Sequence, residues 1–404
     1  MSAPLARRLG PADAVTIGLG SMIGAGVFSA FAPAAAAAGS GLLVGLAVAA
    51  VVAYCNAMSS ARLAARYPES GGTYVYGRER LGAFWGYLAG WAFVVGKTAS
   101  CAAMALTVGF YVWPGQAHAV AVGAVVALTV LSCFGVQRSA LLTRVIVAVV
   151  LAVLAAAVTG IAVSGTGDVS RLDVGTDATA RGVLQAAGLL FFAFAGYARI
   201  ATLGEEVCDP ARTIPRAIPV ALGITLVVYA AVAVAVLSVL GSAGLAASAA
   251  PLTDAVRAAG LSWLGPVVAV GAALAALGAL LALTLGVSRT TLAMARDRHL
   301  PHTLAAVHAG VPRHAEVAVG IVVAVLAATV DLRGAIGFSS FGVLVYYAIA
   351  NCAAWTLRRG VIPAAGLVGC AVLAFSLPLA SVLSGAGVLA AGALVYFTRR
   401  IGRT

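Results

Sequence analysis

The sequence predicts an all-α integral membrane protein with about 12 transmembrane helices. Of its 404 residues, 62% are hydrophobic and only 9% are charged, and the mean hydropathy is +1.05. A typical soluble domain has about 25% charged residues. Apolar runs of about 20 residues, the length that crosses a bilayer, recur along the whole chain. The chain 1–404 is therefore expected to form a single transmembrane domain.

Windows of this length divide the chain into twelve apolar spans. In order, they cover residues 14–38, 41–65, 82–112, 119–136, 142–164, 183–204, 217–240, 265–290, 315–330, 335–356, 361–377 and 379–398.

The basic residues test this count, because cytoplasmic loops collect Arg and Lys. With the N-terminus inside and the loops alternating, 19 of the 25 basic residues fall inside and four fall outside. Lys97 and Arg199 lie within spans. This asymmetry predicts a multi-pass protein of the cell's inner (cytoplasmic) membrane with both termini cytoplasmic. The net charge of +12 is then attracted to anionic membrane lipid, and nucleic acid is not an expected partner.

The first span carries four glycines within nine residues, in the stretch Gly18–Phe28. Each glycine weakens a helix by about 1 kcal/mol relative to alanine, so the helix is expected to break here. At membrane depth, free backbone groups are tolerated only where they line a cavity or contact a ligand. A half-helix starting near Ala25 would direct its amides at an anion, while the preceding carbonyls would face a cation. A zwitterionic amino acid offers both charges. The alternative is that the glycines only allow close helix packing.

The sixth span holds a second candidate break at Ala195-Gly196, followed by Arg199. Interrupted spans at matching positions of two halves indicate inverted repeats with a binding site at their interface. Arg199 is expected to pair with Glu206, two helical turns on. Elsewhere, 66–80 is expected to form an interfacial helix, and Pro251 and Gly260 delimit a short helix.

These motifs resemble those of the amino acid, polyamine and organocation superfamily of secondary transporters, along nearly the whole chain. The resemblance implies a five-plus-five inverted repeat (LeuT-type fold) with discontinuous helices 1 and 6. Repeat one is about 14–164, repeat two about 183–356, and two additional helices cover about 361–398. The matching motifs lie, in order, at Gly18–Phe28, Pro68–Tyr76, Gly90-Trp91, Phe191–Gly196, Glu205–Pro219 and Ala295–Pro301.

The resemblance also implies where a substrate binds. Its carboxylate meets amides of span 1, which fall here on Gly24, Ala25 and Gly26. Its amine meets carbonyls of both breaks, which fall here on Met22, Ile23, Phe192 and Ala195. These contacts specify the amino acid core, so selectivity or gating would come from Phe191, Phe194 and Tyr197, for which ordinary packing is the alternative. Span 5 lacks the lysine of some relatives, so protons and sodium both stay open as coupling ions.

Lys97 is the only lysine in the sequence and lies near the centre of the third span. A central lysine costs about 3 kcal/mol, so it should face the helix bundle and have a task or a partner. Unlike arginine, it can lose its proton when buried. We expect Lys97 to act as a titratable cation coupled to function, with Arg199 as a further candidate for coupling or gating. The alternative for Lys97 is a structural bond to helix-end carbonyls.

Two weaker constellations complete the candidate sites. Thr284 and Ser288 lie one turn apart on span 8, a helix whose hydroxyls help bind sodium in some transporters of this fold, although hydrogen bonding within the helix is the favoured interpretation. Four histidines share a loop without supporting cysteines or carboxylates, so no metal site is expected. The sequence shows neither a nucleotide-binding loop nor a nucleophile and base set. We therefore expect no enzyme activity and no cofactor.

The sequence predicts a secondary active transporter that moves amino acids or closely related amines by alternating access. A polyamine or organic cation carrier is the first alternative. Such a substrate lacks a carboxylate for the span 1 amides, and Lys97 and Arg199 would repel it. A non-transporting amino acid sensor is the second. The sequence does not specify which amino acid is moved or what the oligomeric state is. It also leaves open whether the protein works by uptake, export or exchange.

Overall fold

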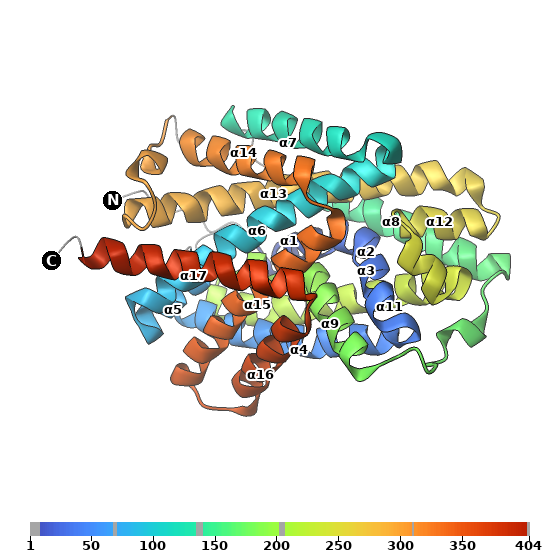
Figure 1. Cartoon of the computed structure of the whole chain (residues 1–404), viewed down its shortest axis with the longest axis horizontal. Coiled ribbons are helices and arrows are strands. Elements are labelled where there is room, and N and C mark those ends of the chain that lie inside the picture. Colours follow the sequence, from blue (N-terminus) through green and yellow to red (C-terminus); the bar gives the residue numbers. More distant parts are fainter. Residues whose placement is uncertain (1–8, 68–70, 135–139, 202–206, 309–310, 402–404) are drawn as a thin grey trace.

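The computed structural model describes residues 9–401 except 68–70, 135–139, 202–206 and 309–310, and this part of the chain is helical (Figure 1). Its α-helices are α1 Pro11–Met22, α2 Ala25–Ser29, α3 Phe31–Ala38, α4 Leu42–Arg66, α5 Thr73–Leu81, α6 Ala83–Val112, α7 Ala117–Cys133, α8 Ala140–Ser164, α9 Ala180–Phe194, α10 Ala198–Ala201, α11 Pro210–Ala247, α12 Pro251–Ala258, α13 Gly265–Arg296, α14 Arg313–Thr329, α15 Leu332–Leu357, α16 Val361–Ser376 and α17 Leu379–Ile401.

Within the described residues, ten helical segments are long and apolar enough to cross a membrane, by length and composition. The helices α14 and α16, which cover the predicted spans 315–330 and 361–377, have 17 and 16 residues. Every predicted span thus has a helix, and the all-helical, multi-pass prediction is confirmed. The count of twelve crossings and the inverted repeat stay predictions.

Both predicted helix breaks are present. α1 ends at Met22 and α2 begins at Ala25, with Gly24 between them at φ −112° and ψ −137°. In the sixth span, α9 ends at Phe194 and the 3₁₀ turn Ala195–Tyr197 separates it from α10. A second interruption, between α2 and α3, was not predicted. It precedes the proline in the first turn of α3, which has no N–H to continue the hydrogen-bond ladder.

The seventh span differs from its prediction of 217–240. α11 begins seven residues earlier, at Pro210, because proline suits a first helical position and because the helix continues through Pro215 and Pro219. The predicted end nevertheless marks a real feature. Gly241 has a φ of +67° and kinks the helix there, a conformation that glycine adopts at little cost.

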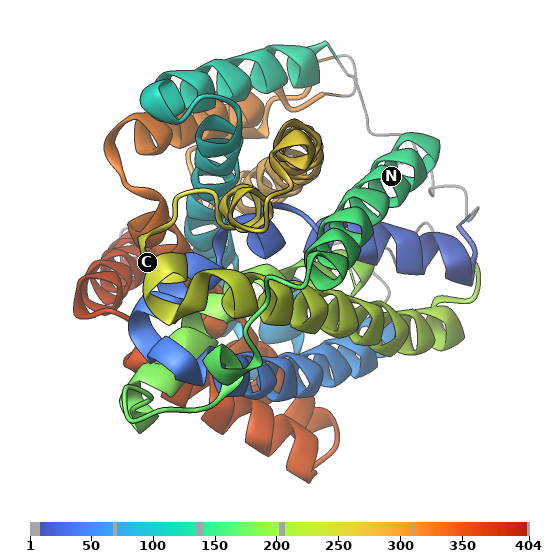
Figure 2. The ribbon, with the colours of Figure 1, turned by 90° about the vertical axis from the view of Figure 1, so that its right-hand side faces the viewer.

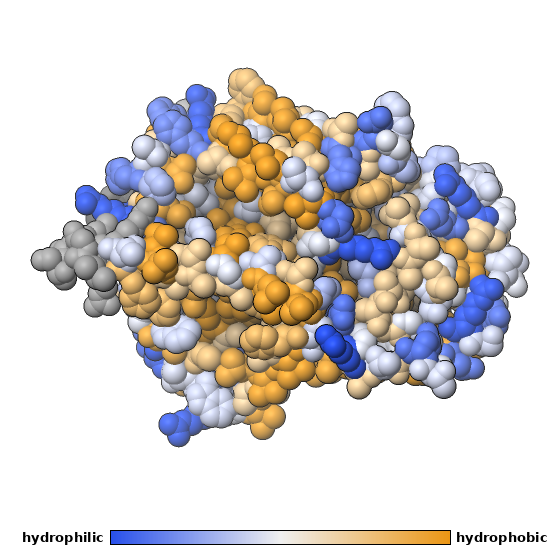
Figure 3. Space-filling model, viewed as in Figure 1, coloured by the Kyte–Doolittle hydropathy of each residue, from blue (hydrophilic) through white to orange (hydrophobic). Residues whose placement is uncertain are grey.

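The centre of the molecule is formed by α6, which packs against α13 and α15. α7 and α14 lie together at one edge and α16 lies at the opposite edge in both ribbon views (Figures 1 and 2). Hydrophobic side chains cover much of the middle of the face in Figure 3, as lipid contact requires. Large exposed apolar residues of the peripheral helices include Val126, Val130, Leu141, Val325, Phe375, Leu383 and Phe397.

Candidate functional site

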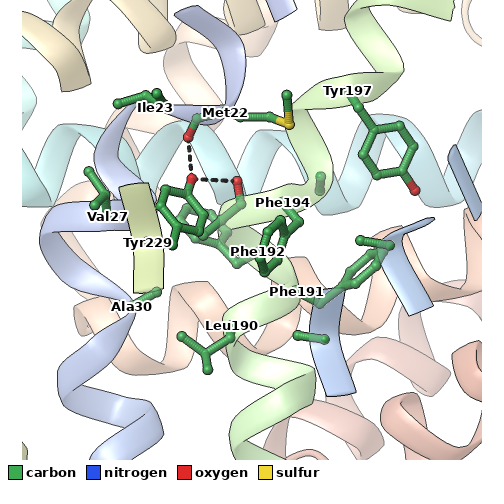
Figure 4. Packing of buried hydrophobic residues seen from close by; sticks show 14 of the residues in the cluster. Met22, Ile23, Val27, Ala30, Leu190, Phe191, Phe192, Phe194, Tyr197 and Tyr229 are labelled. Carbon is green, nitrogen blue, oxygen red and sulfur yellow. Dashed lines mark hydrogen bonds between the residues drawn. The ribbon is translucent and has the colours of Figure 1, made fainter. Parts of the chain in front are cut away.

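A buried tyrosine joins the two helix breaks. The Oη of Tyr229, on α11, donates to the carbonyl oxygen of Met22 at 2.5 Å and lies 3.0 Å from that of Ala193 (Figure 4). The Met22 oxygen also accepts from the amide of Gly24 at 2.8 Å. A carbonyl oxygen has two lone pairs, so Met22, predicted to receive the substrate amine, has its acceptor capacity filled in this conformation.

Sequence reasoning did not single out Tyr229. The available signal is that it is the only aromatic residue in the span 217–240, and a buried tyrosine needs a partner for its hydroxyl.

The glycines at the breaks let the helices touch. A Cβ on Gly24 would lie 2.7 Å from the Cβ of Ala279, and one on Gly26 would lie 2.6 Å from the Cα of Ala193. A Cβ on Gly196 would lie 2.7 Å from the amide of Met22. These separations are shorter than van der Waals contact. The two interpretations of the first-span glycines, helix interruption and close packing, therefore hold together.

A cavity of about 150 Å³ lies beside the breaks. Of the predicted substrate contacts, Phe192 and Ala195 line it, together with Ser21 from the end of α1. The backbone predicted to hold the carboxylate, Gly24 to Gly26, is buried in helix packing next to it. Met22 and Ile23 are likewise buried. Further lining side chains come from α5, α6, α10, α13 and α15, and they include Tyr74, Phe93, Lys97, Ser100, Met104, Arg199, Leu283, Arg289, Thr290 and Tyr346.

Lys97 lines this cavity and is only 6% exposed. Its Nζ donates to the carbonyl oxygen of Ala195 at 3.4 Å, and the Oη of Tyr347 donates to the same oxygen at 3.3 Å. The predicted burial in the bundle is confirmed, and the lysine does contact a helix-end carbonyl, as the structural alternative proposes. Its coupling role stays a prediction.

The three aromatic side chains predicted for selectivity or gating pack in the core. The rings of Phe191 and Tyr197 lie 5.7 and 5.0 Å from the ring of Tyr347, and the ring of Phe194 lies 5.1 Å from that of Tyr229. All three are fully buried (Figure 4). In this conformation they pack as ordinary core residues, which is the alternative to a functional role. A role in selectivity or gating stays a prediction.

The remaining candidate residues are Thr284, Ser288 and Arg199. Thr284 Oγ1 donates to the Leu280 carbonyl at 2.8 Å and Ser288 Oγ to the Thr284 carbonyl at 2.9 Å, which confirms the hydrogen bonding within the helix. A sodium site there stays a prediction. Arg199 lines the cavity, while its predicted partner Glu206 lies outside the described residues.

Two of the sequence motifs meet at one end of the cavity. Tyr74 of α5 lines the cavity and donates through Oη to the carboxylate of Asp297, just after α13. The same hydroxyl lies 3.1 Å from His299 Nδ1, and Arg78 Nη1 lies 3.5 Å from Asp297. Burial raises the pKa of Tyr74, and the bond to Asp297 raises it further, so the phenol stays protonated and donates. Among the residues that the structure describes, no three His, Cys, Asp or Glu side chains are grouped to hold a metal ion.

The comparison with known proteins decides the family. A family model described as "Amino acid permease" matches residues 9–397. The chain belongs to the amino acid permease family. It is therefore a member of the amino acid, polyamine and organocation superfamily, and its motif resemblance is confirmed. The family is a family of transporters.

Relatives of this permease span most of its length. An uncharacterized transporter of Mycobacterium tuberculosis is 73% identical over 98% of this chain and 92% of its own. The branched-chain amino acid permease BcaP of Bacillus subtilis is 26% identical over 97% of this chain and 93% of its own. Cationic amino acid transporter 7, chloroplastic, of Arabidopsis thaliana is 28% identical over 84% of this chain and 63% of its own.

Replacing Tyr229 with phenylalanine should weaken the joint between the breaks. The change removes one hydroxyl and leaves the buried Ala193 and Met22 carbonyls with one hydrogen bond fewer each, which costs about 1–3 kcal/mol. We expect a lower midpoint of thermal unfolding and slower transport by the purified permease. Tyr54→Phe makes the same chemical change at a tyrosine that is 45% exposed and serves as the control. Equal behaviour of the two variants would contradict the assigned role.

Proposed function

We propose that this permease is a secondary active transporter that moves amino acids across the cytoplasmic membrane by alternating access around the breaks in spans 1 and 6. The proposal includes twelve crossings, two inverted repeats and cytoplasmic termini. One observation carries it: the cavity touches both broken helices, through Ser21 at the end of α1 and through Ala195 and Gly196 in the 3₁₀ turn after α9. Backbone groups exposed at such breaks are where a transporter binds its substrate.

In this proposal the substrate amine and Lys97 compete for one acceptor. The Ala195 oxygen already accepts from Lys97 and Tyr347, so an arriving ammonium must replace one of these donors. The substrate carboxylate would reach the amides of Gly24 to Gly26 once the break opens toward the cavity. Displacement of Lys97 links binding to a change in the cavity, and a proton or sodium gradient would drive the cycle.

The charges around the cavity weigh against a polyamine carrier. Among the lining residues that the structure describes, three are charged, Lys97, Arg199 and Arg289, and all three are basic. Cations placed near them are repelled, most strongly where water is excluded. A sensor is the other alternative, and it would bind a ligand without moving it. Accumulation or exchange of labelled amino acids in liposomes separates transport from sensing.

A side chain placed inside the cavity tests this site directly. Gly286 of α13 lines the cavity, and a Cβ built on it has no atom within 4 Å. Gly286→Phe can therefore fill the cavity without a backbone clash. We expect at least tenfold weaker substrate binding and transport, with the thermal midpoint kept. Both are measured on purified protein, by ligand binding in detergent and by uptake into liposomes.

Gly223 supplies the matched control. It lies inside α11, is exposed, and has no atom within 4 Å of a built Cβ. Gly223→Phe makes the same substitution away from the cavity and should leave transport unchanged. Full transport by Gly286→Phe would show that the cavity is not the substrate site.

A further inference from the structure

We infer that this permease selects anionic amino acids, whose side chain carries a carboxylate, and that the Lys97 ammonium binds this carboxylate. The inference rests on the proposed function and names its substrate class. Of the relatives described above, the two whose names state a substrate specify branched-chain and cationic amino acids, and neither points to this class.

The lining of the cavity favours a negative charge. Lys97, Arg199 and Arg289 are basic, and within the described ranges no aspartate or glutamate lines the cavity. Two carboxylates of the described residues interact with neighbouring side chains. Asp297 accepts from Tyr74 and lies 3.5 Å from Arg78. Glu316 interacts electrostatically with Arg289. Of the three basic side chains that line the cavity, Lys97 is the buried one, whereas Arg199 is half-buried and Arg289 is exposed.

Lys97 has donor capacity to spare. An ammonium has three N–H donors, and with the described residues Lys97 makes one hydrogen bond, a long one of 3.4 Å to the Ala195 oxygen. The residue is buried, with an exposed fraction of 6%. A buried charge is costly unless it is paired and fully hydrogen-bonded. A carboxylate in the cavity would supply that pairing through short, charge-assisted hydrogen bonds.

A second donor faces the same cavity. Tyr346 lines it, and its Oη accepts from the Thr73 amide at 3.0 Å. A phenol both donates and accepts, so the Tyr346 hydroxyl is a candidate donor to a ligand oxygen. The volume also suits the class. An apolar cavity of about 150 Å³ can hold a benzene-sized molecule, and aspartate and glutamate side chains are of this size or smaller.

The shared acceptor explains why a neutral amino acid is a poorer substrate. When the substrate amine takes the place of Lys97 at the Ala195 oxygen, the ammonium loses its one hydrogen bond. An acidic side chain gives Lys97 a new and stronger partner at that moment. A glutamine side chain offers a neutral oxygen, and a leucine side chain offers none. The geometry thus separates glutamate from its own amide, two molecules of nearly equal size.

The test is a competition experiment on the purified, full-length permease in liposomes. Uptake of labelled L-glutamate and L-aspartate is measured against unlabelled L-glutamine, L-leucine and L-arginine. We expect glutamate to bind at least tenfold more tightly than glutamine, and arginine not to compete. Lys97→Gln should remove this preference, because it should weaken the binding of glutamate at least tenfold and the binding of glutamine far less. Lys97→Arg keeps the cation and should keep the preference.

A surface charge supplies the control. Arg212 lies near the start of α11, is well exposed and pairs with Asp209 at 3.7 Å, so Arg212→Gln should leave the preference intact. The wild-type competition stands even where Lys97→Gln does not fold. Transport of leucine or arginine without glutamate would overturn this inference and leave the proposed function standing. If no amino acid accumulates or exchanges, the proposed function itself fails. A Lys97→Gln variant that still prefers glutamate would overturn the role of the lysine.

Discussion

Valine in place of Gly26 should abolish transport while the permease still inserts into the membrane. A Cβ at this position would lie 2.6 Å from both the Cα and the Cβ of Ala193. The Cα belongs to the backbone of α9 and cannot turn away, so α2 must shift off α9 at the point where both broken helices meet. Overpacking of this kind costs about 1–3 kcal/mol or more. The shift also displaces the amides proposed to receive the substrate carboxylate.

A graded series makes this expectation measurable. Gly26→Ala adds the Cβ alone and should give a partial loss, whereas Gly26→Val adds a branched side chain and should give a complete one. Gly223→Val is the control, because open space surrounds its Cβ. Substrate binding and uptake are measured on equal amounts of membrane-extracted, monodisperse protein. Wild-type affinity in Gly26→Val would contradict the placement of the substrate at this break.

The breaks could be predicted from sequence because their cause is local. Glycine weakens a helix in any surroundings, so the four glycines from Gly18 to Gly26 predict an interruption even when the packing neighbours of this stretch are unknown. The same holds for the burial of Lys97, since a lone cation in a long apolar span must face the bundle. In both cases one residue type and its position suffice for the argument.

The partners could not be predicted because they are distant in the chain. Tyr229 is 207 residues from Met22, and Tyr74 is 223 residues from Asp297. A bond from Lys97 to a helix-end carbonyl could be predicted as an alternative, but which carbonyl could not, and the structure places the lysine on Ala195 of the second break. Motifs identify which segments matter, whereas helix packing decides which atoms meet.

Internal hydrogen-bond donors occupy the carbonyl oxygens at both breaks. Every carbonyl that a substrate amine is proposed to use at Met22 and Ala195 is held by an internal donor, from Tyr229, Tyr347 or Lys97. Buried carbonyls without partners are costly, so these internal donors stabilise the two breaks in this conformation. Among these donors only Lys97 carries a charge, so a substrate amine that takes its place at the Ala195 oxygen would move a charge within the protein.

We expect transport by the wild-type permease to decrease as the pH rises, and arginine in place of Lys97 should remove this decrease. A lysine ammonium can lose its proton in a buried site, whereas arginine stays protonated. Since the ammonium form predominates at lower pH, wild-type binding of an anionic substrate should be strongest there and should weaken as pH rises. Lys97→Arg should bind over the whole range, and exchange should survive. Lys97→Ala should lose both the pH dependence and accumulation driven by a gradient.

Other titratable groups near Lys97 are kept in all these variants. Cys101 lies one turn along α6 and interacts electrostatically with Lys97, Tyr346 and Arg199 line the same cavity, and His299 lies beyond Tyr74. A pH effect that arises from any of them should persist in Lys97→Arg. The profile is measured as initial uptake per folded molecule in liposomes, with thermal stability determined in parallel. If Lys97→Ala lowers stability but keeps the wild-type pH profile, the lysine is structural and transport is not coupled through its proton.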